Sequence, residues 1–206
     1  MDEKTRVPPG QRVTDRFPVL HVGDVPKFDP GIWDFKVEGE VEKPLKLSYD
    51  EFRKLGKTKD KSDFHCVTGF SLLDNVWEGV RFKTIAKLAK PTKKAKFATI
   101  FCDGGYTTSL PLEDLMEDDV LFAWARNGEE LTPEHGYPLR LVVPKKYAYK
   151  SAKWARGVRF TEEQELGYWE KRGYSNTADP WTEDRYSGLS AHTMIPRIVR
   201  PIAKRL

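Results

Sequence analysis

Hydrophobic and polar residues begin to alternate only after residue 31. Trp33, Phe35 and Val37 are separated by polar side chains, which is the period of a strand with one buried face. Residues 1–31 lack this period and are rich in Pro, Gly and Asp, a composition typical of loops. The pattern therefore predicts an extended arm over residues 1–31 and a folded core that starts at residue 32.

Two segments in the first half of the chain predict helices. Ser48 and Glu51 have the spacing of a capping box, which favours a short helix that Gly56 ends. Residues 80–89 have the pattern of a strand that passes into a helix, and Pro91 stops that helix.

A third helix is predicted near the end of the core, where Thr161 and Gln164 repeat the capping spacing. This helix would run through Trp169 and stop near Gly173. Further strands are predicted over residues 64–67, 96–102, 121–125, 139–143 and 153–160, and the pair Asn127-Gly128 predicts a hairpin turn. Because strands outnumber helices in an irregular order, we predict an α+β fold with mixed β-sheets and short helices.

Composition limits the number of domains and the class of partner. A chain of 206 residues is long enough for one sizeable core, which we place at residues 32–186, followed by a basic and apolar tail at 187–206. The 35 basic and 31 acidic side chains leave a net charge of only +4, which argues against a nucleic-acid partner. With no signal-peptide pattern and no apolar run of membrane-spanning length, we expect a cytoplasmic protein with no membrane span.

Cys66 is the first candidate for chemistry. It lies in Phe64-His65-Cys66-Val67-Thr68-Gly69, where an apolar strand gives way to a loop that contains glycine. A thiolate is a soft donor suited to transition metals, although a lone cysteine on a strand is more often a small buried hydrophobe. The chain has no pattern for a zinc site built from protein ligands alone, so any metal here would need most of its ligands from a cofactor.

A second candidate site is basic. His135 and Arg140 lie in a strand-like run, and Lys150 and Lys153 follow before Trp154. These cations suit a doubly charged phosphate, which arginine can bind with two parallel hydrogen bonds. The alternative is that Arg140 points outward between two leucines and that the lysines are solvated.

Together these motifs resemble the molybdopterin-binding domain of the sulfite oxidase family, in its single-domain prokaryotic branch. Residues 66–71 and 75–80 are similar to the region where a cysteine of that domain binds molybdenum. Residues 135–154 are similar to the family's His-Gly-x-Pro-x-Arg and Lys-Trp pattern, whose basic residues hold the pterin phosphate. Tyr174 lies 21 positions after Lys153, the spacing of the active-site tyrosine of sulfite oxidase. The resemblance runs from about residue 17 to residue 186.

The resemblance implies a molybdenum-molybdopterin cofactor with Cys66 as the metal ligand. Tyr174 would orient the substrate or an oxo group, although it has the alternative of simply packing at a helix end, and Arg172 would attract an anion. The segment near His21 resembles the family's amino-terminal cofactor arm, and residues 103–109 resemble a loop near the cofactor. The residues that we predict to bind the cofactor are His21, His65, Thr68, Tyr106, Thr108, Ser109, His135, Arg140, Lys150 and Lys153.

The implied function is an oxidoreductase that transfers an oxygen atom to or from a small-molecule substrate such as sulfite or a sulfoxide. Val19-Leu20 stands where sulfite oxidase has a substrate-binding arginine, which favours the alternative of a sulfoxide or N-oxide reductase with the same cofactor. Because no cytochrome-like segment precedes the core, we expect a separate electron-transfer partner. Alternatives from another class are a non-catalytic cofactor carrier and a basic binding module that uses Lys93, Lys94 and Lys96.

Overall fold

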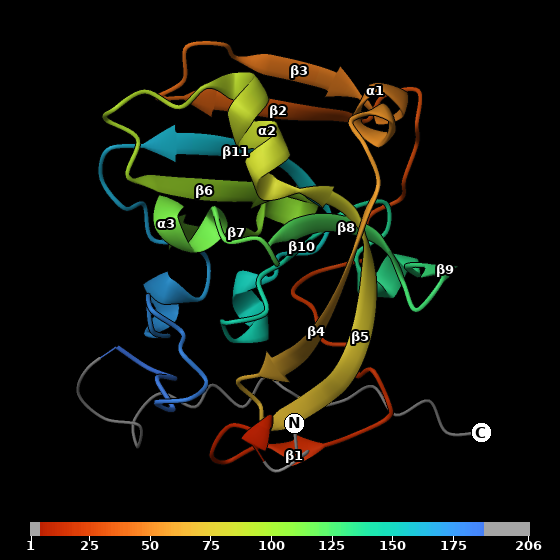
Figure 1. The fold of residues 1–206 in the computed structure, drawn as a ribbon, viewed down its shortest axis with the longest axis vertical. Helices are drawn as coiled ribbons and strands as arrows, with labels where there is room; N and C mark the ends of the chain where they lie inside the picture. The colour runs from red at the N-terminus through yellow and green to blue at the C-terminus, as the bar shows by residue number, and fades with distance from the viewer. Residues whose placement is uncertain (1–4, 188–206) are drawn as a thin grey trace.

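The computed structural model describes residues 5–187 and contains two β-sheets with a few short helices (Figure 1). One sheet has the strand order β3-β2-β11-β6-β7, and the other has the order β1-β5-β8-β10, with β4 paired to β5 and β9 to β8. Each sheet includes one parallel pair, β2 with β11 and β1 with β5, among antiparallel ones. The predicted α+β fold with mixed sheets is confirmed.

The strands of the first sheet are β2 (Asp34–Gly39), β3 (Leu45–Ser48), β6 (Phe97–Cys102), β7 (Thr107–Pro111) and β11 (Ala155–Thr161). Those of the second are β1 (Arg12–Val13), β4 (Thr58–Cys66), β5 (Phe70–Arg81), β8 (Leu121–Arg126), β9 (Glu129–Glu130) and β10 (Arg140–Val142). The α-helices are α1 (Tyr49–Lys54), α2 (Phe82–Ala89) and α3 (Leu112–Leu115), and short 3-10 helices are η2 (Asp103–Gly105), η3 (Pro133–His135), η4 (Ala148–Lys150) and η5 (Glu170–Arg172).

The main hydrophobic core lies between the two sheets and under α1 and α2. Phe35 of β2 and Phe122 of β8 belong to different sheets, and their ring centroids are 5.0 Å apart. Where β5 passes β8 the backbones come too close for a side chain, because a Cβ on Gly79 would lie 1.9 Å from the carbonyl oxygen of Phe122. Glycine is therefore required at this crossing.

The capping box at α1 forms as predicted. The Ser48 hydroxyl accepts the backbone N–H of Glu51, and the Glu51 carboxylate accepts the backbone N–H of Ser48 at 2.8 Å. The helix ends at Lys54, two residues before Gly56. The predicted passage from β5 into α2 is also confirmed, and Lys90, just before Pro91, ends that helix in a left-handed conformation.

The helix predicted from Thr161 through Trp169 is wrong. Thr161 is the last residue of β11, and its hydroxyl donates to the carbonyl of Glu163 instead of capping a helix. The backbone N–H of Tyr168 donates to the carbonyl of Thr107 at the start of β7, so tertiary pairing replaces helical bonding there. Only η5 is helical, and Gly173 does end it.

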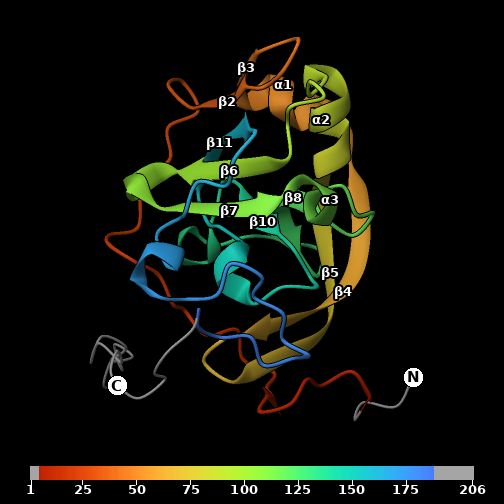
Figure 2. The same cartoon turned by 90° about the vertical axis from the view of Figure 1, so that its left-hand side faces the viewer.

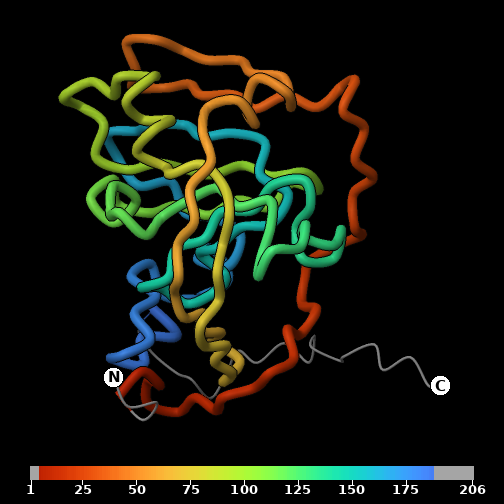
Figure 3. The backbone as a smooth tube through the Cα atoms, turned by 45° about the vertical axis from the view of Figure 1, so that its right-hand side comes forward, coloured from red at the N-terminus to blue at the C-terminus, as the bar shows by residue number. Residues whose placement is uncertain are grey.

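The hairpin of β4 and β5 is much longer than the predicted strand over residues 64–67. Its strands have 9 and 12 residues, and Figures 1 and 3 show it running from α1 and α2 down to the opposite end of the molecule. Residues 58–62 were missed because their side chains are exposed or half-buried and lack an apolar face. The hairpin carries Cys66 to its tip.

The amino-terminal arm is mostly irregular, as predicted, but β1 pairs in parallel with β5 near the hairpin tip. Figure 3 shows the arm passing along the outside of the molecule from that tip to β2. The predicted tail at 187–206 lies outside the described residues except for Ser187, and the domain boundaries stay a prediction. No helix within residues 5–187 is both long enough and apolar enough to cross a membrane.

Candidate active site

Cys66 occupies the last position of β4, directly before the turn of the hairpin. The backbone N–H of Gly69 donates to the carbonyl of Cys66 at 2.9 Å, and Gly69 has φ +100°, a conformation that favours glycine. The arm covers this turn, because the N–H of Arg12 donates to the Gly69 carbonyl at 2.9 Å. The thiol is therefore held between two paired strands and a short, well-bonded turn.

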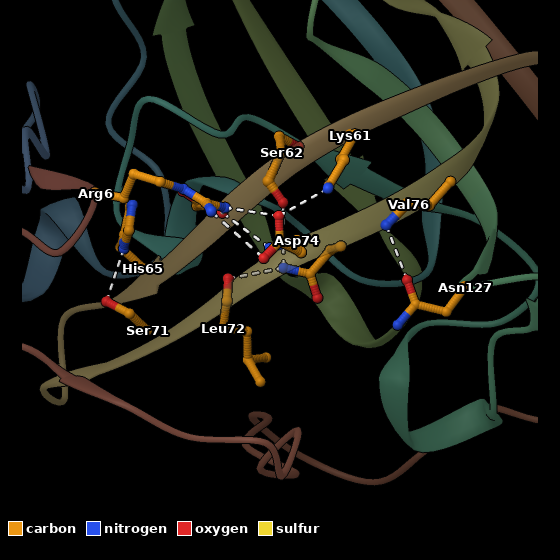
Figure 4. Close-up of polar contacts among 11 residues, drawn as sticks. Arg6, Lys61, Ser62, His65, Ser71, Leu72, Asp74, Val76 and Asn127 are labelled. Carbon is orange, nitrogen blue, oxygen red and sulfur yellow. Dashed lines mark hydrogen bonds and ion pairs between the residues drawn. The ribbon is translucent and has the colours of Figure 1, made fainter. Parts of the chain in front are cut away.

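Charged residues fasten the hairpin close to Cys66. Asp63 sits at an irregularity of β4 between Ser62 and Phe64, and its carboxylate accepts two hydrogen bonds from Arg6 of the arm, at 2.9 and 2.5 Å. Arg6 and Lys61 also reach Asp74 of β5, as Figure 4 shows. These ion pairs connect the arm to both strands of the hairpin.

His65 points into a buried position beside this cluster. Its Nδ1 lies 2.8 Å from the hydroxyl of Ser71 (Figure 4), and its ring contacts the ring of Trp181 edge-on at 6.3 Å. Burial lowers the pKa of His65 below its ordinary value. The sequence prediction counted His65 among the cofactor ligands, and in the structure it connects the hairpin to the carboxy-terminal segment.

The Cys66 thiol lies in positive surroundings. Burial raises its pKa, while a hydrogen bond from the Thr68 hydroxyl at 3.2 Å and the charges of Arg185 and Lys153 lower it. No cluster of three or more His, Cys, Asp or Glu side chains able to hold a metal occurs within residues 5–187. A metal bound at Cys66 would take its other ligands from a cofactor, and a thiolate suits a soft transition metal.

Arg140 lies in β10 and is almost fully buried, with 2% of its surface exposed. Its guanidinium donates to the carbonyl oxygens of His135 at 2.9 Å and Ser151 at 3.1 Å, whereas its Nε has no partner. Gly136 lets Arg140 and Lys153 approach each other, because a Cβ there would lie 3.0 and 3.3 Å from their Cβ atoms. The alternative of an outward-pointing Arg140 is wrong.

The arm packs against these cations. The Phe17 ring stacks on the His135 ring with a centroid separation of 4.3 Å, and the Phe17 carbonyl lies 3.1 Å from Nε2 of His135. The same ring faces the guanidinium groups of Arg126 at 4.8 Å and Arg140 at 5.5 Å. His21, four residues on, contacts the ring of Trp154 edge-on at 5.6 Å. Arm, β10 and the Lys153 segment thus form one basic face.

Within the described part of the chain, Arg126, Arg140 and Lys153 form no ion pair with an acidic side chain. Burial, followed by the charge of Arg126, lowers the pKa of Arg140 to about 9. Burial, followed by the charge of Arg140, lowers the pKa of Lys153 to about 7. Cations held together without anions fit a ligand that brings negative charge, and the unpartnered Nε of Arg140 fits a phosphate oxygen.

Lys150 belongs to a separate buried network. Its amine donates to the Glu170 carboxylate at 2.5 Å and to the Ser109 carbonyl at 2.8 Å, and both side chains of the ion pair are fully buried. Thr108 also donates to Glu170, and Tyr106 donates to the carbonyl of Tyr149. Residues 107–109 form part of β7 and not a loop. The cofactor roles of Tyr106, Thr108, Ser109 and Lys150 stay predictions, and the structure gathers these residues around Glu170.

Tyr174 lies beside the loop that follows Cys66. It packs in a cluster with Val67, Tyr147 and Tyr149, and burial, with smaller contributions from Tyr186 and Cys66, raises its pKa. Tyr149 supports this position, because its hydroxyl donates to the carbonyl of Ser175 at 2.7 Å. The role of Tyr174 in orienting the substrate or an oxo group stays a prediction.

Arg172 has a different environment. It is exposed, donates to the carbonyl of Tyr168 at 2.8 Å, and lies over the Tyr168 ring at 3.6 Å. None of its contacts among residues 5–187 involves Cys66 or Tyr174.

Sequence reasoning missed three residues of this site. Phe17 lies in the arm, where no hydrophobic period exists, and Arg126 follows a buried strand directly before a turn. Arg185 lies in the charged run Glu183-Asp184-Arg185, which is typical of a solvated surface. The structure shows instead that Arg185 donates to the carbonyl of Val67, next to Cys66.

Comparisons with known proteins agree with this geometry. The family model described as oxidoreductase molybdopterin binding domain matches residues 22–169. The uncharacterized oxidoreductase YuiH of Bacillus subtilis is 48% identical over 187 residues, which cover 90% of this chain and 94% of that protein. The protein-methionine-sulfoxide reductase catalytic subunit MsrP of Campylobacter jejuni is 31% identical over 160 residues, which cover 69% of this chain.

The match to MsrP covers only 54% of that protein, so the chain spans about half of its length. Among solved structures, the sulfane dehydrogenase SoxCD from Paracoccus pantotrophus has a similar fold, with a TM-score of 0.63 and 24% sequence identity. That match covers 68% of this chain and 41% of the SoxCD chain. Tyr174 and Arg185 lie beyond the segment that the family model matches.

Proposed function

The chain belongs to the family of oxidoreductase molybdopterin-binding domains, and from this premise we propose that it transfers an oxygen atom at a molybdenum ion bound by Cys66. The observation that carries the proposal is a buried thiol at the tip of the β4-β5 hairpin, close to Lys153, which forms no ion pair with an acidic side chain of residues 5–187. Within the described residues the thiol has no set of companion metal ligands, as expected when a dithiolene cofactor supplies them.

In this proposal Arg140 and Lys153 bind the cofactor's phosphate. The guanidinium of Arg140 offers its free Nε, and Lys153 and His135 approach from either side of Gly136. Phe17 and His21 cover this face from the arm. A phosphate there would restore the charge of Lys153, because an anion within contact favours the protonated amine.

When bound, the molybdenum cofactor supplies two-electron redox chemistry coupled to oxygen-atom transfer. The protein's own residues provide position, charge and exclusion of water. Tyr174 directs its hydroxyl toward the substrate beside Cys66, while Tyr149 holds the backbone of the next residue. Because burial raises its pKa, Tyr174 stays protonated and acts as a hydrogen-bond donor.

We propose a sulfite-type oxidation as the forward reaction. A small sulfur oxyanion gains one oxygen atom that derives from water, and two protons and two electrons are released. A separate electron-transfer protein accepts these electrons. The reverse direction, in which a sulfoxide or N-oxide loses its oxygen to give water while a donor supplies two electrons and two protons, is the second candidate. The similarity to a protein named methionine-sulfoxide reductase favours testing it.

The two cysteines provide a matched test of the proposal. Both are buried at the end of a strand, but Cys102 lies in the main core, and burial together with the charge of Asp103 raises its pKa. Cys66→Ser should abolish turnover and the sulfur-to-molybdenum absorption, since a hydroxyl is a harder and less acidic donor. Cys102→Ser should keep both and lose only stability.

The measurements are molybdenum content, absorption spectrum and turnover with sulfite, sulfoxides and N-oxides. Each variant is first checked for folding by circular dichroism. A Cys66→Ser variant with the activity and spectrum of the parent would refute the proposed metal ligand. X-ray absorption that finds only two sulfur atoms around molybdenum in the wild type would refute it as well.

A further inference from the structure

Arg185 lies between the two parts of the site that carry the proposed chemistry. Its backbone runs beside the Tyr174 segment, since its carbonyl accepts the N–H of Ser175 at 3.1 Å and its neighbour Tyr186 forms a bridge with Tyr174. Its guanidinium donates from Nη1 to the carbonyl of Val67. One side chain thus connects the Tyr174 segment to the residue that follows Cys66.

The ring of Tyr147 packs against the guanidinium of Arg185. The Cζ atom of Arg185 lies 5.3 Å from the centroid of the Tyr147 ring, which is fully buried. The side chain of Arg185 keeps 21% of its surface exposed, so it is neither locked in the core nor free in solvent. This partial exposure leaves room for a small ligand to reach it from outside.

Arg185 also lacks a strong acidic partner among the described residues. Its ion pair is with Glu183 at 3.4 Å, and the Glu183 side chain is 50% exposed. An exposed pair at this separation contributes little. The neighbouring Asp184 carboxylate accepts a hydrogen bond from the hydroxyl of Ser175 at 2.6 Å. An anionic substrate beside Cys66 would therefore contact the Arg185 guanidinium, which is already held there and whose charge is only weakly neutralised by Glu183.

We propose that Arg185 is the specificity-determining residue that binds a negatively charged oxygen of a small oxyanion substrate next to Cys66. The proposal rests on the proposed function and deepens it by naming the residue that selects the substrate. Arg172 does not take this role, because its side-chain contacts are with Tyr168 and not with the residues around Cys66.

The test uses the molybdenum-loaded enzyme and two independent readouts. The first is the dissociation constant of sulfate, which binds without reacting, measured by titration calorimetry. The second is steady-state oxidation of sulfite with ferricyanide, which takes the two electrons in two steps, compared with reduction of dimethyl sulfoxide by a reduced dye. The variants are Arg185→Gln and Arg185→Lys, and the control is Arg159→Gln, an exposed arginine of β11 paired with Glu38.

Arg185→Gln should raise the sulfate dissociation constant and the KM for sulfite by about 10- to 100-fold, the range of a hydrogen bond to a charged group. The kcat for sulfite and the KM for dimethyl sulfoxide should change far less. Arg185→Lys should recover part of the sulfate affinity, because it keeps the charge but loses the planar fork. The Arg159→Gln control should behave as the wild type.

Three outcomes would overturn the role of Arg185: unchanged sulfate affinity in a folded Arg185→Gln variant, equal losses for sulfite and dimethyl sulfoxide, or a wild type that binds neither sulfate nor sulfite. If Arg185→Gln does not fold, the sulfate affinity of Arg185→Lys decides, because an unaltered value would contradict the need for the fork. Sulfate binding requires no turnover, so the sulfate measurement tests the role of Arg185 separately from the proposed function. The proposed metal ligand is tested by the activity of Cys66→Ser, and an active variant would refute it.

Discussion

Replacing Lys153 with methionine should stabilise the cofactor-free protein and weaken its hold on the cofactor. Lys153 is largely desolvated and lies near the charge of Arg140, and among residues 5–187 its amine donates to the carbonyl of Glu134 at 2.5 Å. A charge in such a place opposes folding unless a ligand neutralises it. Methionine has similar length and no charge, so it removes the unfavourable interaction together with the phosphate contact.

The magnitude follows from the pKa of Lys153, which falls from 10.5 to about 7. At about 1.36 kcal/mol for each pH unit, the full difference is roughly 4.8 kcal/mol. The side chain keeps some contact with water, so we expect about half, ~2 kcal/mol, and a melting temperature higher by about 4 to 8 °C. The gain in stability should be complete below pH 7 and should shrink between pH 7 and 10.5. In that range the unfolded wild type binds more protons than the folded wild type, so the folded wild type becomes more stable as pH rises and the advantage of the variant falls.

Thermal and denaturant unfolding of cofactor-free protein at pH 6, 7 and 9 would measure the gain, and pterin fluorescence after denaturing the loaded protein would measure retention. The control is Lys145→Met, an exposed lysine paired with Glu117, which should change neither quantity. A Lys153→Met variant that is less stable without cofactor, or that retains cofactor as well as the wild type, would refute the reasoning.

Other predictions concern turnover and folding. Tyr174→Phe should retain its molybdenum, as measured by mass spectrometry of the metal. It should lower turnover about 10-fold or more, because it removes one hydrogen-bond donor to the charge that develops during the reaction. Unchanged rates at all pH values would remove Tyr174 from the mechanism. Glu170→Gln should lower the free energy of unfolding by about 3 to 5 kcal/mol, because it leaves Lys150 buried without its charged partner. Equilibrium unfolding in urea measures this loss. A loss of less than about 1 kcal/mol, roughly the value of a surface ion pair, would contradict the prediction. Gly79→Ala should severely reduce soluble expression and the melting temperature, because the added Cβ would meet the carbonyl of Phe122. A melting temperature equal to that of the wild type would show that β5 and β8 can move apart at this position.

The fold could be predicted as far as local patterns decide it. Trp33, Phe35 and Val37 alternate, and all three are buried in or beside β2. The capping box at Ser48 gave the right helix because its partner lies three residues away. The same spacing at Thr161 failed because the following backbone bonds to β7, and contacts between distant segments leave no local trace.

The residues of the candidate site also differ in how far the local sequence reveals them. Cys66, Arg140 and Lys153 lie in short motifs that the sequence shows directly, and in the structure these three side chains are close enough to influence one another's pKa. Their roles toward the cofactor stay predictions. Lys150 belongs to such a motif too, yet its amine reaches Glu170. Arg185 could not be predicted, because its position next to Val67 depends on how the segment after Tyr174 folds back over the hairpin (Figure 2).

The parallel pairing of β2 with β11 has a consequence for the order of events in the cell. Residues 36–39 align with residues 157–160, so β2, which pairs with β3 along one edge, leaves the ribosome long before β11 can pair with its other edge. Pairing between segments so distant in sequence is slow, and an unpaired apolar strand is prone to aggregate. The face that receives the cofactor needs both the arm and the segment after β11. We therefore expect the cofactor to be inserted only after the whole chain has been synthesised.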